Sequence, residues 1–167
     1  MPPFSLHMST RSEIVAILSA CIETCTDGGR GFAFAAAEVR APSLKAYFQG
    51  KFEERADFVL ALQKSVEESY SEIEGSAVGA LHRGLVEVRK LVERRSDELV
   101  LQECLRGELA ALKAYDAACA RVPFDSLPPA LRIQYTSQRK AIEGTVDYLR
   151  RRLRADAEAE GRSAPDV

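Results

Sequence analysis

The stretch CIETCTDGGRGFAFAAAEV, residues 21–39, decides whether the first part of the chain is one helix or two. It holds three glycines within four positions, and glycine is common where a chain turns. Across the glycines, however, apolar or small residues recur at alternating steps of four and three: Ile14, Leu18, Cys21, Cys25, Gly28, Phe32, Ala35 and Val39. A turn would break that register, so the pattern predicts one continuous helix from about residue 10 to 40. Gly28 falls in phase, and we expect a neighbouring helix to approach closely there.

Three more long helical stripes follow. The second consists of Leu44, Phe48, Phe52, Val59, Leu62, Val66, Tyr70 and Ile73; the third of Leu101, Cys104, Leu105, Leu112, Tyr115, Cys119 and Val122; the fourth of Leu131, Tyr135, Ile142, Val146, Leu149 and Leu153. We expect Pro42 to end the first helix, Ser96 to cap the third, and the prolines of PFDSLPP to start the fourth. A shorter amphipathic helix, about residues 76–95, is expected between the second and the third.

These elements predict an all-α protein. Its four-helix bundle should cover residues 10–155, between a flexible N-terminus (1–9) and a flexible tail (156–167). Short connections would make helices one and two antiparallel, and likewise three and four. The crossover at about 76–95 would make the second and third helices parallel, which is the connection of a ferritin-like bundle.

The composition is that of an ordinary globular domain. The chain has 167 residues, of which 46% are hydrophobic and 29% charged, and its net charge is −2. No run approaches the ~20 apolar residues of a membrane span, and this charge gives no attraction to nucleic acid or an anionic membrane. The first residues, MPPFSLHM, lack the basic and apolar regions of a signal peptide. We therefore expect a cytoplasmic protein without nucleic-acid or membrane partners.

The four cysteines have no metal-binding spacing. Cys21, Cys25, Cys104 and Cys119 form no CxxC pair, and neither histidine is spaced from them as a zinc ligand would be. Cys21 and Cys25 are one helical turn apart, a spacing that could suit a soft metal. We interpret all four instead as small apolar residues in a reducing interior.

Three segments of the chain resemble a known family. IETCTDGGRGF (22–32), GSAVGALHRGL (75–85) and QECLRGELAALKAYDAA (102–118) are similar to a bacterial family of ferritin-like four-helix-bundle proteins of unknown function. The resemblance covers roughly residues 12–153. It implies the bundle and the crossover, and it implies no established activity.

The ferritin-like class raises the question of iron. Such bundles often hold two irons through a Glu from each of two helices and a Glu-x-x-His from each of the other two. This chain has no Glu-x-x-His, because its only histidines are His7, before the bundle, and His82, in the crossover. By helical phase, Glu108 is the only carboxylate that points inward.

Departures from the family pattern also argue against an iron site. In that pattern acidic residues are usual where this chain has Leu105 and Leu109, and a histidine is usual where it has Ile142. All three positions are apolar here. The sequence therefore predicts that core packing has replaced a ligand cluster, so that the chain has no metal ligands and no cofactor. The alternative is that it binds iron.

His82 allows two interpretations. It stands beside Arg83 and Gly84 on the edge of the crossover's apolar side. As a functional residue it would be a general base or a ligand in a pocket under the crossover. Because no second histidine and no paired nucleophile accompany it, we expect His82 to hydrogen-bond a carbonyl or carboxylate and anchor the crossover to the bundle.

Polar residues also occur on the apolar stripes. Arg55, Glu108 and Gln138 lie in phase with apolar neighbours on three different helices, so each should be buried. A buried charge without a partner is too costly to persist, and Arg and Glu can satisfy each other. We therefore predict that Arg55 and Glu108 meet in the interior, with Gln138 as the candidate third member of a buried polar cluster.

Two classes of function fit these features. The first is a non-catalytic binding or interaction protein that has lost a di-iron site, with a homodimer through an exposed apolar helix face as one arrangement. The alternative is an iron-binding ferritin-like protein, or an oxidase with an unusual ligand set. Because the sequence offers no catalytic group, we expect the first.

Overall fold

The computed structural model describes residues 4–69 and 96–161, and within these ranges all regular secondary structure is helical. The helices are α1 (Phe4–Glu38), α2 (Pro42–Ser69), α4 (Asp97–Cys119) and α5 (Pro129–Ala159), with the short 3-10 helix η2 (Phe124–Ser126) between the last two. This confirms the all-α class. The predicted crossover helix at 76–95, with its anchor His82, lies outside the described residues.

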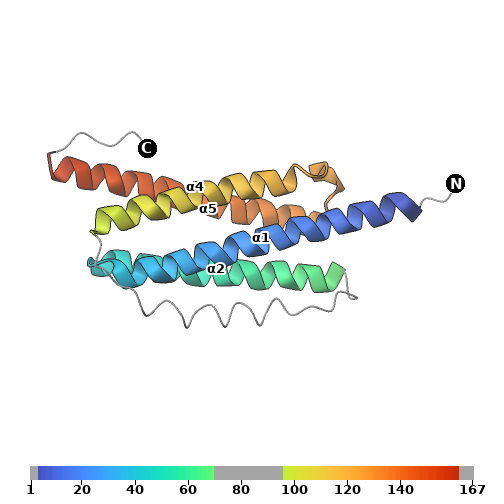
Figure 1. Ribbon diagram of the computed structural model, residues 1–167, viewed down its shortest axis with the longest axis horizontal. Helices are drawn as coiled ribbons and strands as arrows, with labels where there is room; N and C mark the ends of the chain where they lie inside the picture. Colours follow the sequence, from blue (N-terminus) through green and yellow to red (C-terminus); the bar gives the residue numbers. More distant parts are fainter. Residues whose placement is uncertain (1–3, 70–95, 162–167) are drawn as a thin grey trace.

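The four long helices lie side by side (Figure 1). α1 packs along both α2 and α4, α5 packs along α4, and α2 and α5 touch more lightly. α1 is antiparallel to α2, and α4 is antiparallel to α5, whereas α2 and α4 run in the same direction. None of the described helices is long and apolar enough to cross a membrane.

α1 passes through the glycines without interruption, as its stripe predicts. Its start differs from the prediction, because the helix begins at Phe4 rather than near residue 10. Residues 4–9 contain neither glycine nor proline, and Pro2 and Pro3 precede them, where proline favours the start of a helix. Residues 4–9, which the sequence analysis placed before the bundle, are therefore part of α1.

The connection between α1 and α2 is tied to a third helix. α1 ends at Glu38, and Pro42 is the first residue of α2 instead of the residue that stops α1. The carboxylate of Asp97, at the start of α4, accepts hydrogen bonds from the backbone N–H groups of Arg40 (2.7 Å) and Ala41 (3.1 Å). One side chain thus fixes the α1–α2 turn against the N-terminus of α4.

The predicted starts of the last two helices are confirmed. The Ser96 hydroxyl accepts a hydrogen bond from the Leu99 N–H and caps α4, and Pro129 begins α5. α5 continues to Ala159, beyond the expected boundary at 155. Ala157 is buried, and the alanines and the glutamate of its last turn are good helix formers. Residues 156–159, which the sequence analysis assigned to the tail, are therefore helical.

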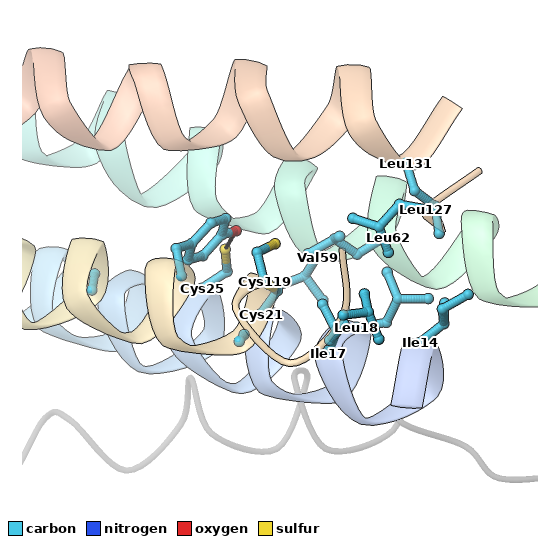
Figure 2. Packing of buried hydrophobic residues seen from close by; sticks show 14 of the residues in the cluster. Ile14, Ile17, Leu18, Cys21, Cys25, Val59, Leu62, Cys119, Leu127 and Leu131 are labelled. Carbon is cyan, nitrogen blue, oxygen red and sulfur yellow. Dashed lines mark hydrogen bonds between the residues drawn. The ribbon is translucent and has the colours of Figure 1, made fainter. Parts of the chain in front are cut away.

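Two apolar clusters fill the bundle. The Cys25 cluster, most of which is drawn in Figure 2, contains Ile14, Ile17, Leu18, Cys21, Cys25, Val59, Leu62, Ala111, Tyr115, Ala118, Cys119, Val122, Leu127, Leu131 and Ile142. The Phe48 cluster contains Phe32, Ala35, Ala36, Val39, Leu44, Phe48, Val100, Leu101, Leu105, Val146, Leu149 and Leu153. On every helix one position separates the two: Gly28, Arg55, Glu108 and Thr145. We call these four positions the polar level.

We predict that Gly28 accepts a methyl group but no larger side chain. A Cβ at this position would lie 3.6 Å from Arg55 Nε and 3.9 Å from Glu108 Oε1, which are ordinary contacts. Gly28→Ala should therefore leave stability unchanged or raise it by up to about 1 kcal/mol, because alanine is the better helix former. Gly28→Leu should lower it by ~1–3 kcal/mol through overpacking. Urea denaturation measures both, and a tolerated leucine would contradict this packing.

Candidate functional site

The polar level is built around a buried ion pair between α2 and α4. Arg55 Nη2 donates a hydrogen bond of 2.5 Å to Glu108 Oε2, and the two residues are 1% and 2% exposed. A second hydrogen bond, from Arg55 Nη1 to Glu54 Oε2 at 3.2 Å, leads toward the surface, where Lys51 also binds Glu54. Arg55 thus has one carboxylate partner in the interior, Glu108, and a second toward the solvent, Glu54.

Aromatic rings hold the guanidinium from two helices. The Arg55 guanidinium carbon lies 5.5 Å from the centre of the Phe32 ring on α1 and 5.2 Å from that of Phe58 on α2. Both distances are within the range of cation–π attraction, which is stronger where water is excluded. The rings therefore stabilise a charge that would otherwise be costly to bury.

Two of the three glycines make room for this arginine. A Cβ at Gly28 would contact Arg55 Nε and Cδ, and a Cβ at Gly29 would lie 3.5 Å from Arg55 Cβ. Gly31 has no atom within 4 Å of the corresponding position. The glycines that raised the question of a turn therefore serve close packing at two positions and leave open space at the third.

Burial raises the pKa of the Glu108 carboxyl, and the guanidinium of Arg55 opposes that rise. Loss of Arg55 would leave the carboxylate in an apolar interior without its main counter-charge. The charged state of Glu108 therefore depends on Arg55.

Gln138 does not join this pair. It is buried in the region of the Cys25 cluster, where its Oε1 accepts a 2.8 Å hydrogen bond from the Tyr115 hydroxyl and its Nε2 donates to the Phe58 carbonyl at 3.3 Å. Its phase placed it on the inner face, but two turns of α5 separate it from Thr145 at the polar level. The predicted cluster of three is therefore an ion pair and a separate network.

The second network extends to α1. Cys25 Sγ lies 2.9 Å from the Tyr115 hydroxyl, a contact drawn as the dashed line in Figure 2. Because Tyr115 gives its only hydroxyl proton to Gln138, the Cys25 thiol must be the donor in this contact. Burial raises the pKa of both the Cys25 thiol and the Tyr115 phenol, so both keep their protons. Phe58 connects this network to the ion pair, because its ring lies against Arg55 and its carbonyl accepts the hydrogen bond from Gln138.

An open groove runs beside the ion pair, between α1 and α4. Its volume is about 650 Å³. Its walls are mostly small or apolar: Gly28, Gly31, Phe32, Phe34 and Ala35 on α1, and Val100, Cys104, Gly107, Ala110, Ala111 and Ala114 on α4. Glu108 also lines the groove, although it is almost fully buried, so the groove ends beside one member of the ion pair.

The described part of the chain contains no group of three or more His, Cys, Asp or Glu residues that could hold a metal ion. Leu105 and Ile142, two of the three apolar positions considered for a lost ligand cluster in the sequence analysis, are buried, and Leu109 is 39% exposed. All four cysteines are free; Cys104 is half-buried at the groove, and the other three are buried. Burial raises the pKa of the Cys21 and Cys104 thiols to about 12, so neither is a reactive thiolate.

Comparison with known proteins places the chain in a family. Residues 13–121, more than half of the chain, match a family described as a domain of unknown function (DUF2383), and the chain belongs to it. The match includes Arg55, Glu108 and both walls of the groove, and it ends before α5 and Gln138. No curated protein and no solved structure matches the chain.

Sequence reasoning missed the aromatic rings and the groove, although each had a signal. Phe58 follows Arg55 by three positions, so the two share a helix face. Gly107, Ala110, Ala111 and Ala114 recur at helical spacing and form a stripe of small residues on α4. That stripe could have indicated a surface where α4 leaves space beside its neighbour.

We predict strong coupling within the ion pair. Arg55→Met and Glu108→Leu should each cost ~3–5 kcal/mol of stability, because each leaves a buried charge without its partner. The double variant should lose much less than the sum. Urea denaturation of all four proteins measures the coupling. The exposed pair Arg139–Asp116, with 2.7 Å between Nε and Oδ1, is the control and should couple by no more than about 1 kcal/mol. Additive losses at Arg55 and Glu108 would contradict the pairing.

A second prediction concerns the hydroxyl of Tyr115. Tyr115→Phe keeps the ring but leaves the Cys25 thiol and the Gln138 carbonyl without a partner, so it should cost ~1–3 kcal/mol. Adding Gln138→Leu should recover part of this loss, because the buried amide is then removed. Thermal denaturation checks both. Tyr148→Phe removes a hydroxyl on α5 and serves as the control. Equal small losses for the two phenylalanine variants would contradict the network.

Proposed function

We propose that this chain is a ferritin-like bundle in which an ion pair has replaced a di-iron centre, and that it acts by binding without catalysing a reaction. The helix directions support the first part of the proposal. Two antiparallel pairs, α1–α2 and α4–α5, with α2 and α4 parallel, are what a ferritin-like connection produces (Figure 1).

The observation that carries the proposal is the Arg55–Glu108 ion pair at the polar level. A di-iron bundle directs carboxylates from all four helices, and two histidines, into its interior. At the polar level this chain presents a glycine, an arginine, a glutamate and a threonine, one from each helix. A guanidinium has no lone pair for a metal and repels a cation. In this proposal the positive charge that balances Glu108 therefore comes from Arg55 and not from a metal ion.

The binding role follows from what the chain offers in place of a metal centre. The groove between α1 and α4 is concave, mostly apolar and open to solvent, and its volume is in the usual range of small-molecule sites. No described group has the paired base and nucleophile that covalent or acid–base chemistry needs. A homodimer through an exposed apolar helix face and a cytoplasmic location remain predictions.

Metal analysis tests this function. Wild-type protein, purified without chelators and then incubated with Fe(II) under nitrogen and desalted, should retain far less than one iron per chain by elemental analysis. Glu53→Leu, an exposed carboxylate on α2, is the control variant. Stoichiometric iron that persists in Glu53→Leu and disappears in Glu108→Leu would overturn the proposal in favour of an iron site. Should Glu108→Leu fail to fold, its combination with Arg55→Met removes the unpaired charge and answers the same question.

A further inference from the structure

The charged side chains that line the groove between α1 and α4 are already neutralised within the protein. Each acid of the lining has an arginine partner, and the pairs are Asp27–Arg30, Glu103–Arg106 and Glu108–Arg55. Because each pair consists of one negative and one positive charge, their charges cancel. An ionic ligand would therefore find no unmatched counter-charge, and it would lose part of its hydration on entering a mostly apolar groove.

Two glycines face each other across the groove. α1 and α4 run in opposite directions (Figure 1), and the contacts Cys25–Tyr115 and Arg40–Asp97 define their register. Counting along both helices from these contacts places Gly31 at the level of Gly107. Both line the groove, and at each of them no neighbouring atom of the described residues lies within 4 Å of the position that a Cβ would take. The space therefore extends to the backbones of both helices at this level.

This space is a feature of the groove and not of the core. A glycine in a helix costs about 1 kcal/mol relative to alanine, and neither Gly31 nor Gly107 recovers that cost by close packing against the described residues. Phe34, three positions after Gly31, and Cys104, three positions before Gly107, are half-buried and line the groove beside them. The Cys104 thiol keeps its proton, so it adds an uncharged, polarisable surface.

We infer that the groove binds an uncharged, apolar small molecule, whose body lies between Gly31 and Gly107 against the backbones of α1 and α4. This inference rests on the proposed binding function and names its ligand class. Burial of the apolar body supplies the affinity, because the charges of the lining are already matched. The volume of about 650 Å³ is sufficient for such a molecule.

Three probes that carry the same eight-carbon chain test the ligand class: 1-octanol, octylamine and octanoate. By calorimetric titration the alcohol should bind one per chain and most tightly. The amine and the acid should bind at least about fivefold more weakly and within about threefold of each other, because each ion is partly desolvated without gaining a partner. 1-Hexanol should bind about fifteenfold more weakly than 1-octanol, since each buried methylene contributes roughly fourfold. Equal binding of all three probes, a preference for either ion, or no saturable binding of 1-octanol would overturn the inference.

Four glycine variants locate the site. Gly31→Leu and Gly107→Leu, on opposite walls, should each fill the groove and weaken 1-octanol binding at least about tenfold. Gly50→Leu on α2 and Gly144→Leu on α5 are the controls, because these glycines also have open space but lie outside the lining. Leucine is the better helix former, so all four variants should keep or raise the thermal midpoint. Binding retained in either groove variant, or lost in either control, would overturn the inference.

The same variants identify other occupants of the groove. A lower thermal midpoint in the two groove variants alone would mean that another part of the chain fills it. A change of oligomeric state confined to them, measured by analytical ultracentrifugation, would mean that a second copy does, and either result overturns the inference. The metal test remains separate. An iron-free wild type that fails to bind 1-octanol refutes the ligand class and leaves the replacement of the metal centre standing, whereas iron that is lost on Glu108→Leu refutes the proposed function itself.

Discussion

The bundle depends on keeping one positive and one negative charge out of water at its centre. Arg55 and Glu108 lie on α2 and α4, which pack less closely with each other than each does with α1. Their contact therefore crosses the interior. It requires glycines on α1 to clear space for the arginine and aromatic rings to cover the guanidinium. A buried ion pair adds little net stability compared with an apolar core, yet it strongly disfavours arrangements that separate the charges.

The ion pair and the Tyr115 network together restrict how the helices can slide. Apolar stripes define which face of a helix is buried, but a shift by one turn exchanges one apolar side chain for another at modest cost. Hydrogen bonds have no such tolerance, because a shifted donor is left without an acceptor. Bonds from α2 to α4, from α4 to α1 and α5, and from Asp97 to the α1–α2 turn thus hold all four helices in one register.

The groove arises from the same arrangement. The glycines of α1 bring it close to α2, where Arg55 fills the space, while the face of α1 toward α4 carries Gly31 and meets a stripe of small residues. Two helices with small side chains at their contact would normally pack closely, but their positions here are set by the ion pair and the two apolar clusters. The space that remains reaches as far as Glu108, which lines the groove while it stays buried and bonded to Arg55.

The sequence by itself determined the helices, the uninterrupted passage of α1 through its glycines, the Ser96 cap and the inward direction of Arg55 and Glu108. These are local properties, because helical period and capping depend on residues a few positions apart. Only the tertiary structure decided which inward groups meet. Phase gives the face of a helix and not its height in the bundle, so Gln138 has the right face and the wrong level. The groove was likewise decided by the spacing of helices far apart in the chain, which no single stripe contains.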